Sequence, residues 1–259
     1  LFRMKSELII LGCGSSIGIP RIDGYWGKCN KKQKKNYRTR CSAIIIKGSN
    51  SILIDTSPDL RHQLLSNKIK NISSVLFTHE HADQTNGLFE LRPFFWKNKK
   101  RINAFGDMLT MNLLRKRQNY LFKNFGSYPP IIKANFVKSK FSLGKRKEKI
   151  FFKTFKVKHG NTNVVAYVFE KTAYISDCND LSIVKIKELK NLKYLIIDCL
   201  KISKHPSHFN LKECLYIHKC LKPKKTILTN LSNDLDYDFL IRRLPKNVVP
   251  AYDGLKINI

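Results

Sequence analysis

The sequence predicts an α/β fold in which helices cover the outer faces of β-sheets. Short apolar runs alternate with turn signals along the whole chain, a pattern that is typical of strands joined by loops or helices. Consecutive strand patterns dominate the first half, and strands alternate with helical patterns in the second half. Such elements bury their apolar faces by packing helices onto sheets.

The expected elements follow from periodicity and from helix caps. Strands are predicted, in chain order, at 7–11, 42–47, 51–55, 74–78, 149–158, 164–169, 172–176, 194–198, 225–230, 248–252 and 255–259. Helices, several of which open on Asp or Asn caps, are predicted at 58–66, 107–121, 181–190, 210–221 and 234–244. The polar stretches 30–40 and 138–149 are expected to be surface loops, and neither resembles a domain linker. We therefore predict one domain over residues 1–259.

The composition indicates a folded and strongly basic chain. A hydrophobic content of 42% in 259 residues is ample for a buried core. Lys and Arg number 49 against 19 Asp and Glu, which gives a net charge of +30. One explanation is an anionic partner, either a small phosphorylated substrate or RNA, and the other is a compositional bias spread over solvated faces. The shortage of acidic residues favours an anionic substrate.

The cysteines and the apolar runs bear on the cellular compartment. The seven cysteines are odd in number and contain no CxxC pair, which fits a reducing compartment. The N-terminal apolar run has no cleavage region, and no stretch approaches the roughly 20 apolar residues of a membrane span. We expect a cytoplasmic protein with no membrane partner, and a homodimer is compatible with the sequence.

The segment THEHADQ at 78–84 has the composition of a metal site. A strand ends at Thr78, and strand ends are where α/β folds gather functional groups. His79 and His81 lie two positions apart, so both imidazoles can point to one side and reach one ion. Asp83 adds a hard oxygen ligand, and zinc accepts both kinds of donor.

Further polar residues follow other predicted strands. His159 and Asp177 each close a strand pattern, and His205 and His208 come shortly after the strand at 194–198. Core packing alone does not demand polar residues at the ends of successive strands. These side chains are therefore expected to converge at one edge of the fold.

The segment THEHADQ resembles the His-x-His-x-Asp-His signature of the metallo-β-lactamase superfamily. The segments GCGSSIGIPRIDGYWGKC, ILIDTSPDLRHQLL, SHFNL and PAYDGL are similar to its cyclic phosphodiesterase branch, which includes PhnP and lies close to tRNase Z. The resemblance runs nearly end to end. It implies a four-layer αβ/βα sandwich of two mixed β-sheets, with metal ions at one edge between them.

The resemblance also implies a set of metal ligands. A first ion would be held by His79, His81 and His159, with Asp177 bridging to a second ion. The second ion would use Asp83, Asp177 and two positions at which the family usually has histidine. This chain has Gln84 and Asn230 at those two positions.

Both departures from the family fall on the second ion. A carboxamide is a neutral oxygen donor that competes poorly for zinc beside imidazole, whereas Mn²⁺ and Mg²⁺ tolerate it better. We therefore predict one strong Zn²⁺ site. The second site is predicted to be weak, absent or selective for Mn²⁺ or Mg²⁺, with Gln84 and Asn230 as weak ligands.

Catalytic roles follow from the same resemblance. Asp83 would orient the attacking water when the second ion is absent, and His208 would donate the proton to the leaving alkoxide or hold the phosphate. His205 is the alternative proton donor. Asp55 either supports the histidine loop from behind or caps the following helix. Arg61 and Arg92 are candidate phosphate clamps because guanidinium binds phosphate bidentately.

The favoured function is a metal-dependent phosphodiesterase that hydrolyses a cyclic phosphate or a similar small phosphodiester by metal-activated water. An RNA-processing hydrolase of the tRNase Z type is the alternative enzyme, which the net charge favours and the lack of an obvious arm for gripping tRNA disfavours. A ligand-binding protein that lost catalysis together with its second ion is the non-enzymatic alternative.

Overall fold

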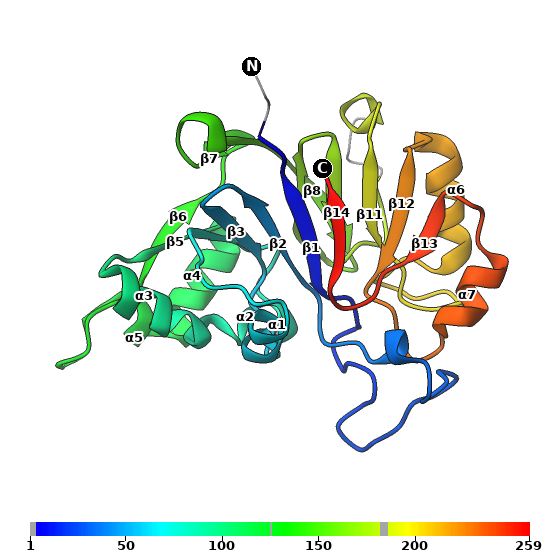
Figure 1. The fold of residues 1–259 in the computed structure, drawn as a ribbon, viewed down its shortest axis with the longest axis horizontal. Helices are drawn as coiled ribbons and strands as arrows, with labels where there is room; N and C mark the ends of the chain where they lie inside the picture. Colours follow the sequence, from blue (N-terminus) through cyan, green and yellow to red (C-terminus); the bar gives the residue numbers. More distant parts are fainter. Residues whose placement is uncertain (1–3, 125, 182–185) are drawn as a thin grey trace.

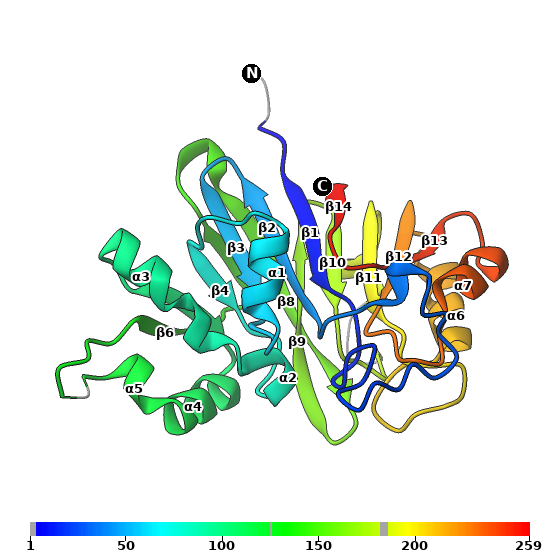
Figure 2. The ribbon, with the colours of Figure 1, turned by 60° about the horizontal axis from the view of Figure 1, so that its bottom comes forward.

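The computed structural model describes residues 4–124, 126–181 and 186–259. Within these residues the strands form two seven-stranded mixed sheets, with helices on their outer faces (Figures 1 and 2). Three apolar clusters lie between the layers: one under each set of helices and one between the two sheets. The predicted four-layer αβ/βα sandwich is therefore confirmed.

The first sheet has the strand order β14-β1-β2-β3-β4-β5-β6, in which β3 to β6 run parallel. Its strands are β1 (Glu7–Gly12), β2 (Ser42–Lys47), β3 (Asn50–Ile54), β4 (Ser74–Leu76), β5 (Ile102–Gly106), β6 (Ile132–Phe136) and β14 (Leu255–Asn258). The helices beside it are α1 (Leu60–Ser66), α2 (Ala82–Thr85), α3 (Arg92–Asn98), α4 (Met108–Arg117) and α5 (Asn119–Phe122).

The second sheet has the order β13-β12-β11-β10-β9-β8-β7, in which β10 to β13 run parallel. Its strands are β7 (Lys140–Leu143), β8 (Ile150–His159), β9 (Thr162–Phe169), β10 (Thr172–Ile175), β11 (Tyr194–Asp198), β12 (Lys225–Thr229) and β13 (Val248–Pro250). Helices α6 (Leu211–Leu221) and α7 (Tyr237–Arg243) cover it. The 3-10 turns are η1 (Lys34–Asn36), η2 (Leu88–Leu91), η3 (Arg146–Glu148) and η4 (Ile186–Leu189).

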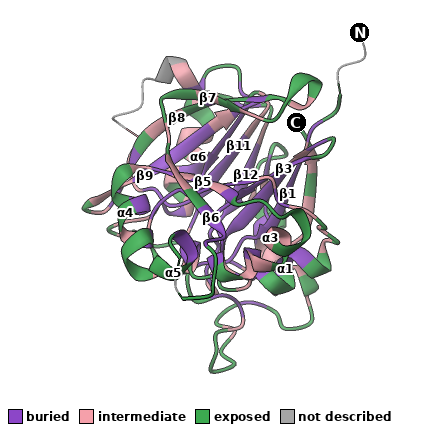
Figure 3. Ribbon diagram, turned by 90° about the vertical axis from the view of Figure 1, so that its left-hand side faces the viewer, coloured by how far each residue is buried: buried purple, intermediate pink, exposed green. Residues whose placement is uncertain are grey.

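Strand alternation sorts side chains between these layers. Along β1, Ile9 and Leu11 face the helices, whereas Leu8 and Ile10 pack in the cluster between the sheets. Both faces of a central strand are thus apolar, which is why the buried strands read as continuous apolar runs. Figure 3 shows the buried strands inside and the exposed residues on the outer helices and loops.

Several sequence-based expectations are corrected by the structure. The stretch 138–149, expected to be a loop, contains β7 and η3. Strands β5 and β6 and helix α3 were not predicted, because β5 and β6 carry asparagines and α3 is too short to show a period. The helix expected at 107–121 is divided into α4 and α5 at Gln118. For the helix expected at 181–190, residues 182–185 lie outside the described part of the chain.

The cap of α6 confirms its predicted start, whereas α7 begins at Tyr237, three residues later than predicted. Asn210 caps α6 in a reciprocal capping box with Glu213, and the side chain of Asp236 accepts a hydrogen bond from the Phe239 N–H at the start of α7. In the described ranges no helix has both the length and the apolar composition needed to cross a bilayer.

The two sheets are joined at the edge where the loops after β4 and β8 lie. The Val165 N–H of β9 donates to the Thr78 carbonyl at 2.9 Å, and the Tyr167 hydroxyl donates to the Phe77 carbonyl at 2.6 Å. These bonds fix the end of the segment after β4 against the second sheet. The long segment between β1 and β2 projects from the bottom of the molecule in Figure 1.

Candidate metal centre

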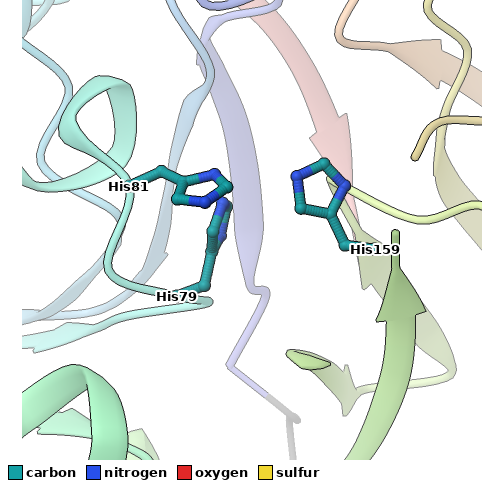
Figure 4. Close-up of side chains that lie close together, drawn as sticks. All are labelled: His79, His81 and His159. Carbon is teal, nitrogen blue, oxygen red and sulfur yellow. The ribbon is translucent and has the colours of Figure 1, made fainter. Parts of the chain in front are cut away.

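Three histidines from the two sheets face one another. His79 and His81 lie in the segment between β4 and α2, and His159 is the last residue of β8 (Figure 4). The ring centroids are 4.4 Å apart for His79 and His81, 5.5 Å for His79 and His159, and 5.3 Å for His81 and His159. One ligand nitrogen from each ring lies within 4.8 Å of the others, so the predicted first-ion ligands are brought together.

The hydrogen bonds behind His79 orient its ring. The buried Asp55 accepts the Thr78 N–H and the Thr78 hydroxyl, each at 2.8 Å. Burial raises the pKa of Asp55, whereas both bonds favour its carboxylate form. Because the Asp55 carboxylate can only accept, the single hydroxyl proton of Thr78 is donated to Asp55. Thr78 Oγ1 therefore accepts a hydrogen bond from His79 Nδ1, which lies 3.0 Å away. The lone pair of His79 then lies on Nε2, which is buried without a partner.

His159 is oriented in the same sense by a different partner. Its Nδ1 lies 2.7 Å from the Ser207 carbonyl oxygen, which can only accept a hydrogen bond. Nδ1 therefore carries the proton, and Nε2 carries the lone pair. Metal-binding histidines commonly have one ring nitrogen fixed by such a donor bond.

The electrostatics favour the neutral imidazoles that metals require. Burial, followed by the neighbouring His81, lowers the pKa of His79 to about 3. Burial also lowers the pKa of His159, although Asp177 opposes the shift. A neutral ring with a free Nε2 is ready to coordinate. The three-histidine cluster therefore fits one bound ion.

Two carboxylates lie beside this cluster. One atom each of His159, the buried Asp177 and His208 lie within 4.8 Å of one another, which makes a second group with metal-ligand chemistry. Burial and the nearby Asp177 raise the pKa of Asp83. Asp83 and Asp177 are thus close enough to influence one another, as the ligand assignment requires.

Gln84 and Asn230 turn amide nitrogens towards these carboxylates. Gln84 Nε2 lies 3.0 Å from Asp83 Oδ2 and 3.4 Å from Asp177 Oδ2, and Asn230 Nδ2 lies 3.2 Å from Asp177 Oδ1. Rotating either amide would bring its oxygen against carboxylate oxygens. Both side chains are buried, and they stand at the two positions where the resemblance implies histidine ligands of the second ion. The three histidines fit one ion, whereas the amide nitrogens that face Asp83 and Asp177 do not act as metal ligands.

His208 is paired with a buried aspartate that the sequence analysis missed. His208 Nδ1 lies 2.8 Å from Oδ2 of Asp198, the last residue of β11. Burial lowers the pKa of His208, but the hydrogen bond and charge of Asp198 outweigh it and the net shift is upward. Burial raises the pKa of Asp198 to about 7. Both shifts favour a proton held between His208 and Asp198.

A polar cavity of about 480 Å³ opens onto the cluster. It is lined by Ser15, Ser16, Ile17, His81, Asp83, His159, Asp177, Leu200, Lys201, His205, His208, Asn230, Ser232, Asn233 and Asp234. Ser15, Ser16 and Ile17, from the segment that follows β1 and its last residue Gly12, form part of the cavity wall. A Cβ at Gly12 would lie 2.2 Å from the Arg40 carbonyl oxygen, so only glycine fits there.

Neither predicted arginine lines this cavity. Arg61 is exposed on α1, and Arg92 packs over the rings of Phe89 and Tyr128 at 4.6 and 5.7 Å. His205 does line it, with its ring 5.1 Å from that of His208. Asp55 does not cap α1, whose N-cap is Asp59.

Asp198 and Thr78 were not predicted as site residues, but the position of Asp198 in the sequence indicates its role. Asp198 ends the run YLIID just as Asp55 ends SILID, and both carboxylates are fully buried behind a site histidine. Thr78 was identified only as a strand end, although its hydroxyl links Asp55 to His79. The partner of a buried aspartate lies on another strand, so the sequence does not reveal it.

A family model described as a β-lactamase superfamily domain matches residues 50–229 of this chain. Among curated proteins, an octanoyltransferase of Porphyromonas gingivalis (strain ATCC BAA-308 / W83) is 29% identical over 253 residues. The alignment covers 96% of this chain and 50% of that protein, so the chain spans about half the length of the relative.

Solved structures extend the likeness over the whole chain. A diphosphatase from the PhnP family has 29% identity and a TM-score of 0.90, covering 99% of this chain and 98% of that one. Zn²⁺-bound PqqB from Methylobacterium extorquens has 14% identity and a TM-score of 0.79, covering 98% and 100%. The short form of human tRNase Z has 16% identity and a TM-score of 0.69, covering 97% and 98%. The last two likenesses show the fold.

Proposed function

The chain belongs to the β-lactamase superfamily, and on that premise we propose that it is a metal-dependent phosphodiesterase acting on a cyclic phosphate or a similar small phosphodiester. The observation that carries the proposal is the convergence of His79, His81 and His159 beside two carboxylates and a proton-holding histidine. The likeness to a PhnP-family diphosphatase supports a phosphorylated substrate.

His79, His81 and His159 would hold one ion, and Zn²⁺ suits three imidazoles. A bound ion of this kind lowers the pKa of water and polarises a phosphoryl oxygen. Asp83 lines the same cavity, and its raised pKa suits a carboxylate that takes a proton from water. The protein thus supplies the base as well as the ion ligands.

The leaving alkoxide needs a proton, and His208 is the group suited to deliver it. Its Nδ1 is bound to Asp198, so Nε2 is the nitrogen that remains for the substrate. Its ring centroid lies 4.6 Å from that of His159, beside the three-histidine cluster. His208 is therefore the preferred acid, with His205 behind it as the alternative.

The test is hydrolysis of bis-p-nitrophenyl phosphate by protein loaded with Zn²⁺ or Mn²⁺. We expect turnover that is lost on chelation and falls at least 100-fold in His159→Ala and Asp83→Ala, because each removes a ligand or the base. Turnover that persists in both variants would overturn the assignment. Binding of phosphate without turnover under any metal would indicate the non-catalytic relative.

The net charge of +30 favours RNA as a second candidate substrate. An RNA-processing hydrolase would bind RNA with an affinity that falls steeply with salt, because bound counterions are released. Cleavage of precursor tRNA, with weak turnover of small esters, would favour this candidate. The seven free cysteines support a reducing compartment such as the cytoplasm for either enzyme.

A further inference from the structure

The segment that carries His208, between β11 and α6, belongs to no helix or strand. Its base is closed by the Leu200 N–H, which donates to the Phe209 carbonyl at 2.9 Å. Residues 202–207, which lie between these two, form bends and irregular backbone. The position of His208 relative to the ion cluster therefore depends on side chains that reach this segment from other loops.

Asn179 is a side chain that connects this segment to the loop of His159. Its Oδ1 accepts the Gly160 N–H at 2.8 Å, and its Nδ2 donates to the Pro206 carbonyl at 3.1 Å. Both partners are backbone groups, one directly after the ion ligand His159 and one two residues before His208. The oxygen and the nitrogen of one amide thus bind two different loops, which fixes the orientation of the amide.

The backbone of Asn179 is itself fixed against the second sheet. Its N–H donates to the Lys158 carbonyl at 2.9 Å, and the Lys158 N–H donates to the Asp180 carbonyl at 3.1 Å. These two bonds pair the segment after β10 with the end of β8. Asn179 therefore holds the His208 segment from a backbone that is anchored next to the ion cluster.

The loops of His159 and His208 also touch directly. His159 Nδ1 donates to the Ser207 carbonyl at 2.7 Å, and a Cβ built on Gly160 would lie 3.1 Å from the Cβ of Ser207. The consecutive carbonyls of Pro206 and Ser207 thus each accept a bond from a side chain beside the ion cluster. Asn179 is not among the ion ligands, so its bond can be removed while the three histidines are kept.

We propose that Asn179 is a positioning residue, which holds His208 beside the ion cluster so that the ring can give its proton to the leaving oxygen of the substrate. This inference rests on the proposed function and adds a residue to its proton-delivery step. The bond to Asp198 holds one atom of the His208 ring, whereas the place of the ring as a whole follows its backbone. The ring lies 4.6 Å from that of His159, and a small displacement of a reacting group is costly in rate.

The test compares Asn179→Ala with the wild type on two phosphodiesters. Ethylene phosphate is a cyclic diester whose leaving alkoxide needs a proton, whereas p-nitrophenolate leaves bis-p-nitrophenyl phosphate without one. We expect kcat for ethylene phosphate to fall about 10- to 100-fold with KM unchanged within about threefold, and kcat for bis-p-nitrophenyl phosphate to fall less than about threefold. The zinc content should equal that of the wild type, because the three histidines remain.

Asn50→Ala is the matched control. Asn50 Nδ2 donates to the carbonyls of Leu143 and Glu148 at 3.4 and 3.2 Å, so this variant also removes an amide that bridges two backbone groups. Asn50 begins β3 and does not line the cavity beside the ion cluster. Both esters should therefore be hydrolysed at the wild-type rate, whatever the change in unfolding temperature.

The exchange rate of the His208 Nδ1 proton, measured by NMR, is a readout that needs no turnover. We expect faster exchange in Asn179→Ala and the wild-type rate in Asn50→Ala, because a loosened segment opens the bond to Asp198 more often. Equal losses on both esters, or an unchanged exchange rate in Asn179→Ala, would overturn the positioning role. A wild type that hydrolyses neither ester with any metal would overturn the proposed function, and the exchange rates alone would then decide whether Asn179 holds His208.

Discussion

The amide nitrogen of Asn230 lies 3.2 Å from Oδ1 of Asp177, and Gln84 approaches Oδ2 of the same carboxylate at 3.4 Å. Asp177 thus receives a neutral hydrogen-bond donor on each oxygen, where the resemblance implies a bridging ligand between two cations. The two departures from the family signature act together. Both place an amide group beside Asp177 where the resemblance implies a histidine ligand.

The first prediction concerns the number of bound ions. Wild-type protein should bind about one Zn²⁺ per chain, and Gln84→His with Asn230→His should bind about two, because imidazole is the better zinc ligand. Asn230 has φ of 61°, a left-handed conformation that histidine also adopts, so the backbone should accept the exchange. Elemental analysis after dialysis measures the ratio.

A matched variant separates ligation from packing. Gln84→Met with Asn230→Met removes the donors and adds no good zinc ligand. It should stay near one ion and unfold at a lower temperature, because two buried carboxylates lose hydrogen bonds. Two tightly bound ions in the wild type would contradict the one-ion assignment.

The sequence was informative about the layers and the first ion for physical reasons. Buried strands such as β2 and β11 are continuous runs of branched apolar residues. A polar residue at or just after the end of such a run is therefore easy to recognise in the sequence. His79, His81 and His159 belong to this class. Parallel strands end at a common edge of a sheet, so the convergence of these histidines is expected from the sequence.

The remaining features depend on contacts between distant segments. The run KFSL of β7 is half polar and pairs with β8 at the edge of the sheet, so its sequence does not differ from that of a loop. The orientation of the Gln84 and Asn230 amides depends on the carboxylate of Asp177, which lies 93 and 53 positions away from them in the sequence. Arg92 was expected at the site, but its guanidinium instead packs over the rings of Phe89 and Tyr128.

The second prediction concerns the hydrogen bonds behind His79. Asp55→Asn should lower Zn²⁺ affinity about 10- to 100-fold, the usual cost of losing an outer partner of a metal ligand. The new amide would donate to Thr78 Oγ1, and the Thr78 hydroxyl would then donate to His79 Nδ1 and move the ring proton to Nε2. Competition with a chromophoric chelator measures the affinity.

Thr78→Val is the companion variant. It removes the hydroxyl with little change in volume, so His79 is no longer forced into the wrong tautomer. Its zinc affinity should therefore lie between those of the wild type and Asp55→Asn. If Asp55→Asn binds zinc as tightly as the wild type, the hydrogen bonds of Asp55 do not set the state of His79.

The third prediction concerns Asp198 and proton delivery by His208. Asp198→Asn should slow hydrolysis of an alkyl phosphodiester about 100-fold, since general acid catalysis contributes on this scale. The same variant should slow bis-p-nitrophenyl phosphate by less than about tenfold, because p-nitrophenolate leaves without a proton. Equal losses on both substrates would point to general damage of the site, and an intact metal content checks that the ion is retained.

The last prediction concerns the role of Asp236 in stability at acid pH. Asp236 binds the segment that contains Asn30 and Asn36, about 200 positions earlier in the sequence. Its Oδ2 accepts the Asn30 N–H at 3.0 Å and the Asn36 side-chain amide at 2.6 Å, and its Oδ1 caps α7 through Phe239 at 2.8 Å. Burial raises the pKa of Asp236, but these hydrogen bonds and the charge of Arg38 outweigh it, so the net shift is downward.

A carboxyl whose folded pKa is depressed adds stability above its unfolded pKa of about 3.9, and this stability is lost as the pH falls through the folded pKa. Asp236→Ala should therefore lower the free energy of unfolding by about 1–2 kcal/mol at pH 7, the range for a lost helix cap. Denaturant titrations at pH 7 and near pH 3 should show a smaller difference from the wild type at the lower pH. Asp234→Asn, beside the exposed Lys28, serves as the control and should differ little from the wild type at either pH. A deficit of Asp236→Ala that grows on acidification would show that the charge of Asp236 opposes folding.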